Sequence, residues 1–190
     1  MPIHLAAGFD NPKTLRAIIR LYPHYKPISS GNRTSKFLSS SPLQNAVNFN
    51  LPDNARILLE HFPELISLCD DVFDRNYTVI HSAMRHDALL VRVLLEYAPP
   101  EVITARTNHG YCALHLCQMG KSSVINYIEK LELMMNAGNF TGMERNFRGV
   151  TPIRIVWGTR SMSKEKLMEI FKLDTDEELE EALRVVEGDY

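Results

Sequence analysis

The sequence lacks the features that direct a chain into a membrane or an oxidising compartment. No apolar run approaches the length of about 20 residues that a membrane-spanning helix needs. The first four residues, Met1 to His4, contain neither the basic region nor the apolar region of a secretory signal peptide. Only three cysteines occur, and an odd number does not indicate a disulfide framework. We therefore expect a soluble, cytoplasmic or nuclear chain with free thiols and no membrane partner.

The sequence also lacks a strong excess of charge of either sign, since 21 Lys and Arg residues face 23 Asp and Glu residues. A dedicated nucleic-acid binder carries a basic surplus, so we expect no nucleic-acid partner. The basic residues near the start still offer one candidate surface, formed by Lys13, Arg16, Arg20, Lys26, Arg33 and Lys36.

The charge is nevertheless unevenly placed along the chain. Residues 1–40 hold six Lys or Arg and one Asp, a net +5, whereas residues 174–190 hold eight Asp or Glu and one Arg, a net −7. Two interpretations stay open for the acidic end. It either steers a partner or keeps the end of the chain soluble.

Motifs of common catalytic chemistry are missing as well. The sequence shows no glycine-rich phosphate loop, no Ser-His-Asp order and no paired-carboxylate motif. We therefore expect a protein that is not an enzyme and has no cofactor.

What the sequence does contain is a six-residue phrase that returns five times. Its copies start 40, 37, 34 and 39 residues apart. A phrase with such a period indicates a repeat protein, in which each unit packs only against its neighbours. The copies are Pro2-Ile-His-Leu-Ala-Ala7, Pro42-Leu-Gln-Asn-Ala-Val47, Val79-Ile-His-Ser-Ala-Met84, Ala113-Leu-His-Leu-Cys-Gln118 and Pro152-Ile-Arg-Ile-Val-Trp157.

The phrase resembles the Thr-Pro-Leu-His-x-Ala opening of an ankyrin repeat, whose period is about 33 residues. Ser41 and Thr151 match its first position, and each precedes a proline. Ser or Thr caps a helix, and proline suits the first helical position because that N–H needs no intrahelical partner. The histidine can hydrogen-bond backbone groups in the preceding turn. The resemblance implies an all-α solenoid of stacked helix-turn-helix units with β-hairpin-like turns.

A second helix is expected after each phrase, because aliphatic residues recur there at helical spacing. These helices should begin at Asn11, Asp53, Asp87, Ser122 or Ser123, and Ser163. The fourth should bury Val124, Ile125, Ile128 and Leu131. The first three should end at the prolines that follow them, Pro23, Pro63 and Pro99.

Between its repeats an ankyrin fold needs a tight turn with a residue at positive φ. Asn76, Gly110 and Gly149 supply residues that tolerate this conformation. The resemblance then places five repeats near residues 1–40, 41–73, 74–107, 108–145 and 146–173.

The segment after the last repeat is predicted to be an acidic capping helix, residues 174–190. Thr175 and Glu178 have the spacing of a capping box. An apolar stripe follows and should cover the open end of the stack, at Leu179, Ala182, Leu183 and Val186.

Four residues that can bind metal crowd into nine positions: His109, Cys112, His115 and Cys117. A zinc site and a Cys/His nucleophile pair are the two chemical interpretations. The spacing does not match the C-x₂-C type, and no second Cys/His pair lies at finger distance. His115 and Cys117 also occupy positions of the repeated phrase, so we expect a packing role and no metal.

The resemblance further implies that a partner lies on the concave face, against turn tips and the exposed ends of the inner helices. Tyr77, Tyr111 and Phe147 would then form an aromatic ladder, unless each ring packs on the neighbouring turn. The protein-binding candidates are Phe49, Asp74, Arg75, Tyr77, Arg85, His86, Asn108, His109, Tyr111, Phe147 and Arg148.

These expectations combine into one function, non-catalytic recognition of another protein. The chain would act as an adaptor, scaffold or inhibitor in intracellular signalling or transcription, and we expect a monomer. One alternative is a substrate-receptor subunit of a ubiquitin ligase, although residues 174–190 show no apolar ligase-binding box. Another is the targeting domain of a larger enzyme.

Overall fold

The computed structural model of the protein describes residues 2–25, 41–68, 76–117, 123–159 and 162–185. Within these ranges the chain is all-helical and contains no strand. The helices are α1 (Pro2–Ala7), α2 (Pro12–Leu21), α3 (Pro42–Asn48), α4 (Pro52–His61), α5 (Val79–Ala83), α6 (Ala88–Leu95), α7 (Pro100–Ile103), α8 (Val124–Gly138), α9 (Pro152–Gly158), α10 (Lys164–Phe171) and α11 (Asp176–Leu183), with two short 3₁₀ helices, η1 (Pro63–Ser67) and η2 (Ala113–Leu116).

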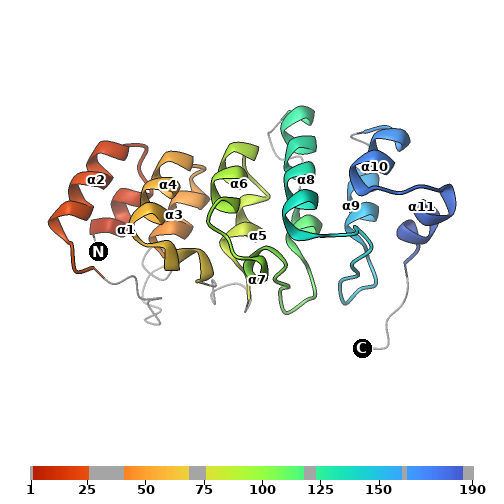
Figure 1. Ribbon diagram of the computed structural model, residues 1–190, viewed down its shortest axis with the longest axis horizontal. Coiled ribbons are helices and arrows are strands. Elements are labelled where there is room, and N and C mark those ends of the chain that lie inside the picture. Colours follow the sequence, from red (N-terminus) through yellow and green to blue (C-terminus); the bar gives the residue numbers. More distant parts are fainter. Residues whose placement is uncertain (1, 26–40, 69–75, 118–122, 160–161, 186–190) are drawn as a thin grey trace.

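The helices are arranged as pairs that stack side by side into an elongated body (Figure 1). The helices that carry the repeated phrase form a first row, in which α1, α3, α5, η2 and α9 pack in this order. Their partners form a second row, in which α2, α4, α6, α8 and α10 pack in the same way. Each pair therefore contacts the pairs before and after it, as expected for a repeat protein.

Capping side chains explain where several of these helices begin. Asn11, Ser123 and Ser163 each accept a hydrogen bond from a backbone N–H in the first turn of α2, α8 or α10, which confirms the predicted starts. α4 begins one residue earlier than predicted, at Pro52. After α4, Pro63 does more than stop a helix, because it opens the short helix η1, where its missing N–H costs nothing.

The core runs between the two rows and is built on the second position of the phrase. The five side chains at that position are buried, with at most 1% of their surface exposed: Ile3, Leu43, Ile80, Leu114 and Ile153. Burial of one such side chain stabilises the fold by about 1.5–3 kcal/mol. Small residues accompany them in the first three copies, Ala6, Ala46 and Ala83, all of which are buried.

The prediction for the buried face of α8 is wrong in its first turn. Val124 and Ile125 are exposed, Ile125 to 78%. The first turn of α8 extends beyond the neighbouring helices of the second row (Figure 1), which agrees with the exposure of these two side chains. The buried stripe begins later and consists of Tyr127, Lys130, Leu131, Met134 and Met135.

In the described parts of the connections between pairs, each residue predicted to adopt a positive φ does so. The angle is 69° at Asn76, 75° at Gly110 and 68° at Gly149. Around Gly110 the Thr107 N–H donates to the Tyr111 carbonyl at 2.9 Å, and the Asn146 N–H donates to the Val150 carbonyl at 3.0 Å in the next turn. Neighbouring turns are linked, since the Phe147 N–H donates to the His109 carbonyl at 3.1 Å.

Two phrase histidines join one pair to the next. His115 Nδ1 accepts the Cys112 N–H at 3.1 Å, and its Nε2 lies 3.0 Å from the Val150 carbonyl of the following turn. His81 repeats this arrangement with the Thr78 N–H at 3.1 Å and the Tyr111 carbonyl at 3.2 Å. A ring nitrogen beside a carbonyl must donate, so both rings carry the proton on Nε2. The histidines thus reach forward to the next turn as well as back to their own.

The last helix covers the end of the stack. α11 packs against α9, and Leu179 and Ala182 of α11 are buried. Thr175 and Glu178 form the predicted capping box, and the Thr151 hydroxyl donates to the Ala182 carbonyl at 2.5 Å. Within the predicted segment 174–190, the helix spans Asp176–Leu183 and lies on α9 of the last pair. Val186 lies outside the described residues.

Candidate functional site

The first-row helices α3 and α5 end side by side, and their ends enclose a hollow of about 420 Å³. Four side chains of the described residues line this hollow, which we call the Arg85 hollow: Asn48, Ser82, Arg85 and His86. Of these, Arg85 and His86 are among the residues that the sequence predicts for a binding face, and so is Phe49, the neighbour of Asn48.

Helix-ending hydrogen bonds hold these residues in place. α3 ends at Asn48, and Asn50 then takes the backbone out of the helix with a φ of 55°, while the Leu51 N–H donates to the Ala46 carbonyl at 2.9 Å. At the end of α5 the Arg85 N–H donates to the Ser82 carbonyl at 3.2 Å, and the His86 N–H donates to the Ala83 carbonyl at 2.9 Å. The backbone of the hollow is thus part of the helix ends.

A buried amide ties the two helices together at the base of the hollow. Gln44 of α3 is buried, and its Nε2 donates to Asn48 Oδ1 at 2.9 Å and to Ser82 Oγ at 2.8 Å. Each of these two oxygens therefore already accepts a hydrogen bond. The side chains of Asn48 and Ser82 keep their own N–H and O–H hydrogens for other acceptors.

The charged groups around the hollow act on the pKa of His86 in both directions. Burial lowers the pKa of His86, the positive charges of Arg85 and Lys130 lower it further, and Asp87 opposes them. His86 is consequently neutral near pH 7. The Asp87 carboxylate accepts hydrogen bonds from the side-chain amides of Asn50 at 2.6 Å and Asn126 at 2.7 Å.

A lysine lies completely buried behind the hollow. Lys130 of α8 has no exposed surface, and its Nζ donates to the Met84 carbonyl at 2.9 Å. Burial lowers the pKa of its ammonium, whereas Cys117 and Asp87 act in the opposite direction. A buried cation is costly unless it is hydrogen-bonded, so this residue fixes the end of α5 against α8.

An apolar surface adjoins the hollow. Phe49 is 54% exposed, and its ring covers Gly8, where an added Cβ would lie only 3.2 Å from the ring carbons. Phe9 is 66% exposed directly after Gly8, and Leu5 of α1 is exposed as well. Leu5, Phe9 and Phe49, called the aromatic patch below, give this end of the first row three exposed apolar side chains.

The turn residues predicted to bind lie in two different environments. Tyr77 and Tyr111 are half-buried and rest against the phrase histidines, with ring centroids 5.2 Å apart for Tyr77 and His81 and 5.5 Å apart for Tyr111 and His115. These two rings therefore pack within their own repeats. Asp74 and Arg75 lie outside the described residues.

Phe147 does not continue the row of the two tyrosines. In the turn of the last repeat it occupies the position of Asn108, and Val150 occupies the position of Tyr111. Its ring is 51% exposed and lies over Gly110, where an added Cβ would be 2.8 Å from Cδ1. Asn108, His109 and Arg148 are exposed around it. The predicted ladder therefore resolves into one exposed aromatic tip and two half-buried tyrosines.

The Cys/His cluster has the geometry of a packing element. Cys112 Sγ lies 3.0 Å from His115 Nδ1, Cys117 is buried, and His109 is exposed. Burial raises the pKa of the Cys112 thiol to about 11 and that of Cys117 to about 12, so neither is a thiolate near pH 7. Among the described residues no three His, Cys, Asp or Glu side chains come close enough to hold a metal ion.

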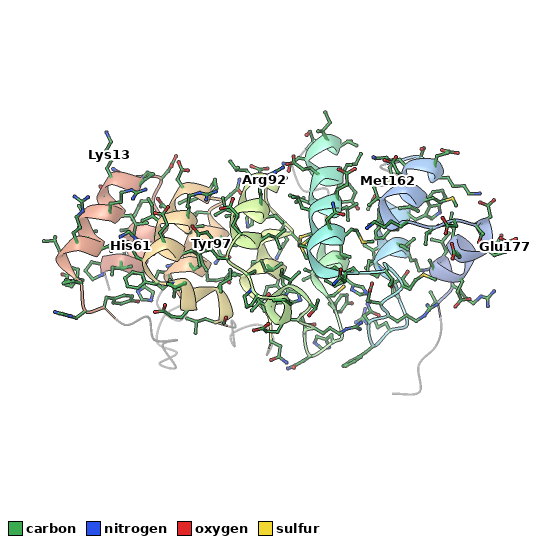
Figure 2. All side chains as sticks on the ribbon, in the orientation of Figure 1. Lys13, His61, Arg92, Tyr97, Met162 and Glu177 are labelled. Atoms are coloured by element: carbon green, nitrogen blue, oxygen red, sulfur yellow. The ribbon has the colours of Figure 1, made fainter. Side chains whose placement is uncertain are left out.

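The two charged ends predicted from the sequence lie far apart. Figure 2 shows Lys13 of α2 at one end of the stack and Glu177 of α11 at the other. Arg16 of α2 is partly neutralised, since it lies 3.8 Å from Glu60 of α4. Three of the basic candidates fall outside the described residues, namely Lys26, Arg33 and Lys36.

Several site residues were missed by sequence reasoning although the sequence held a signal for them. Leu5 and Ser82 both occupy the fourth position of the phrase, so the repeat alone could have placed them on one face. Lys130 falls on the same helical stripe as Tyr127 and Met134, which marks it as buried. Gln44 is a polar residue at a core position, where three of the other four copies of the phrase have histidine.

No family model matches the chain, and no curated protein sequence matches it either. None of the helices in the described part of the chain is long and apolar enough to cross a membrane.

Proposed function

We propose that the chain is an ankyrin-type repeat solenoid that acts as a non-catalytic protein-binding module. Its binding face would be formed by the ends of the first-row helices, at the Arg85 hollow and the aromatic patch. The observation that carries the proposal is the exposure of Phe49 and Arg85 at the ends of two neighbouring first-row helices. Aromatic and Arg side chains are the types that dominate binding energy at protein interfaces.

The ankyrin-type assignment is supported by features that recur from pair to pair. The phrase forms an α-helix in the first, second, third and fifth pairs and a 3₁₀ helix in the fourth pair. Residues at positive φ sit in the turns, and His81 and His115 make equivalent bonds to the following turn. Solenoids of this kind present long open surfaces, and the role follows from what binds there. We propose an adaptor, scaffold or inhibitor in intracellular signalling or transcription.

The second row is a poorer candidate for the binding face. Ion pairs connect its neighbouring helices, as between Arg92 and Glu129 at 2.6 Å and between Lys166 and Glu132 at 3.0 Å. Their charged groups already have partners. Partly exposed pairs of this kind contribute about 0–1 kcal/mol each to stability.

The test is affinity purification from a native lysate with three forms of the chain. The site variant carries Phe49→Ala and Arg85→Ala, and the matched control carries Leu21→Ala and Arg20→Ala, which remove the same kinds of exposed side chain from α2. Both must melt within a few degrees of the parent chain. We expect the site variant alone to lose a specifically bound protein, by roughly 30-fold in affinity for a loss of about 2 kcal/mol.

Equal recoveries from all three forms would reject this face as the binding surface. A bound protein lost only from the α2 control would move the surface to the second row.

A further inference from the structure

We infer that the Arg85 hollow binds an acidic side chain, Asp or Glu, of the partner's contacting segment, with a neighbouring apolar residue of that segment on the aromatic patch. The inference rests on the proposed function and deepens it, because it states the chemistry of the partner.

The first reason is that the hollow offers mainly hydrogen-bond donors. Gln44 Nε2 donates to Asn48 Oδ1 and to Ser82 Oγ, so each oxygen already accepts one hydrogen bond from the protein. The hydrogens of the Asn48 amide and the Ser82 hydroxyl remain for a ligand, together with the guanidinium of Arg85. Among the described residues, no carboxylate lines the hollow. A ligand group that only accepts hydrogen bonds fits this lining, and a carboxylate is such a group.

The second reason is the sign of the local charge. The charged groups around His86 are Arg85 and Asp87 beside it in the chain and Lys130 from α8, while α3 contributes the neutral Asn48. The Asp87 carboxylate is bound by the amides of Asn50 and Asn126. With His86 neutral, two cations and one anion leave a net positive charge, which complements a single negative charge.

The same inventory favours a carboxylate over a phosphate group. In the described part of the chain only one guanidinium lines the hollow, and the ammonium of Lys130 already donates to the Met84 carbonyl. A phosphate carries nearly two negative charges at neutral pH and is bound by clusters of Arg. One Arg with neutral donors matches a monoanion.

The aromatic patch determines which kind of residue should lie next to the acidic residue in the partner's segment. Phe49 directly follows Asn48, which lines the hollow, and its exposed ring lies over Gly8 beside Phe9. A segment whose carboxylate enters the hollow therefore brings its neighbours onto apolar surface. The expected motif is an Asp or Glu within a few residues of a Phe, Leu or similar side chain.

Selection of random dodecapeptides displayed on phage tests the inference. The baits are the parent chain, Arg85→Glu, and Arg20→Glu as a control that reverses an exposed charge on α2. Arg85 is exposed, so both variants should fold, and their melting temperatures are compared with the parent. We expect the parent and the control to select peptides that pair Asp or Glu with an apolar residue, and Arg85→Glu to lose them.

The selected peptide is then measured by fluorescence anisotropy with its acidic residue intact, changed to Gln, or changed to phosphoserine. Loss of a charge-assisted hydrogen bond should weaken binding by roughly 10- to 100-fold for the Gln peptide, and equally for the Arg85→Gln protein with the acidic peptide. A carboxylate should also raise the pKa of His86 on binding. Affinity should therefore increase from pH 7.5 to pH 6, and this increase should vanish in His86→Gln.

The outcomes separate the two proposals. Selected peptides without acidic enrichment, equal selection by Arg85→Glu, or tighter binding of the phosphoserine peptide would overturn the carboxylate inference and leave the binding face in place. Failure of every bait to select any peptide would count against the face itself as well.

Discussion

His115 offers a direct test of how neighbouring pairs are held together. Its side chain is buried, its Nδ1 accepts the Cys112 N–H at 3.1 Å, and its Nε2–H donates to the Val150 carbonyl at 3.0 Å in the next turn. The substitution His115→Ala removes both bonds at once. It also removes the ring that contacts Tyr111, whose centroid lies 5.5 Å away.

The expected cost follows from the groups that lose their partners. The Cys112 N–H is fully buried, and an unpaired buried donor costs about 1–3 kcal/mol. The Val150 carbonyl is half-buried, so water can replace part of its bond and its loss is smaller. The space left by the ring adds a cavity cost. We expect the free energy of unfolding to fall by about 2–5 kcal/mol in total.

Urea unfolding at pH 7.5, followed by circular dichroism, measures this loss. His109→Ala is the matched control, because His109 lies six residues earlier with an exposed side chain, and its removal should change stability by less than about 0.5 kcal/mol. Equal effects of the two substitutions, or a loss under about 1 kcal/mol for His115→Ala, would refute the bridging role.

The pH dependence of stability provides a second test of His115. Burial lowers the pKa of His115 below its ordinary value of 6.5. The unfolded chain then binds a proton before the folded chain does, so stability is complete above about pH 6.5 and is lost as the pH falls below it. One such group gives a slope of at most about 1.4 kcal/mol per pH unit. His115→Ala should show a shallower loss between pH 6.5 and pH 5.

Three further outcomes follow from the contacts described above. Deletion of residues 174–190 should lower the melting temperature and expose apolar surface, because Leu179 and Ala182 cover α9. We expect the free energy of unfolding to fall by about 2–3 kcal/mol. An unchanged melting temperature would assign this segment to partner binding instead. Gly110→Ala should lower the free energy of unfolding by more than about 1 kcal/mol, because φ is 75° and the new Cβ would clash with Phe147. In the control Gly158→Ala the new Cβ meets nothing within 4 Å, so a denaturant titration should show unchanged or higher stability. In a Cys69→Ser background, Cys112 and Cys117 should not react with a disulfide reagent at pH 8 until urea unfolds the chain. The reason is that burial raises their pKa values to about 11 and about 12. Rapid labelling of the native protein would contradict their burial.

Much of the helical framework could be predicted because its signals are local. Ser123, Ser163 and Thr175 mark helix starts through hydrogen bonds that span three residues, and such patterns are visible in the sequence. The positive φ values at Gly110 and Gly149 follow from residue type in the same way. The exposure of Ile125 was missed because it depends on how far α8 extends past its neighbours, which no local pattern records.

The candidate site could be predicted only in part, for a related reason. The repeat placed Phe49, Arg85 and His86 at helix ends, but a repeat alignment cannot show which side chains meet across a pair. The hollow depends on Gln44 contacting Ser82 across 38 positions, and the charge behind it comes from Lys130, 46 positions from Met84. Residue type alone groups Phe147 with Tyr111, whereas the hydrogen bonds of the two turns show that Phe147 corresponds to Asn108.

The contacts that join α3 to α5 also decide what the hollow can bind, and this link can be tested. Gln44→Met keeps a side chain of similar length but removes both donated bonds, so Asn48 Oδ1 and Ser82 Oγ become available as acceptors. The hollow then presents acceptors as well as donors. We expect the preference for the Glu peptide over its Gln counterpart to shrink by roughly 10-fold, while binding still requires Phe49. A preference that stays unchanged in a folded Gln44→Met protein would mean that Arg85 alone selects the charge, and that the buried amide serves only to join the two helices.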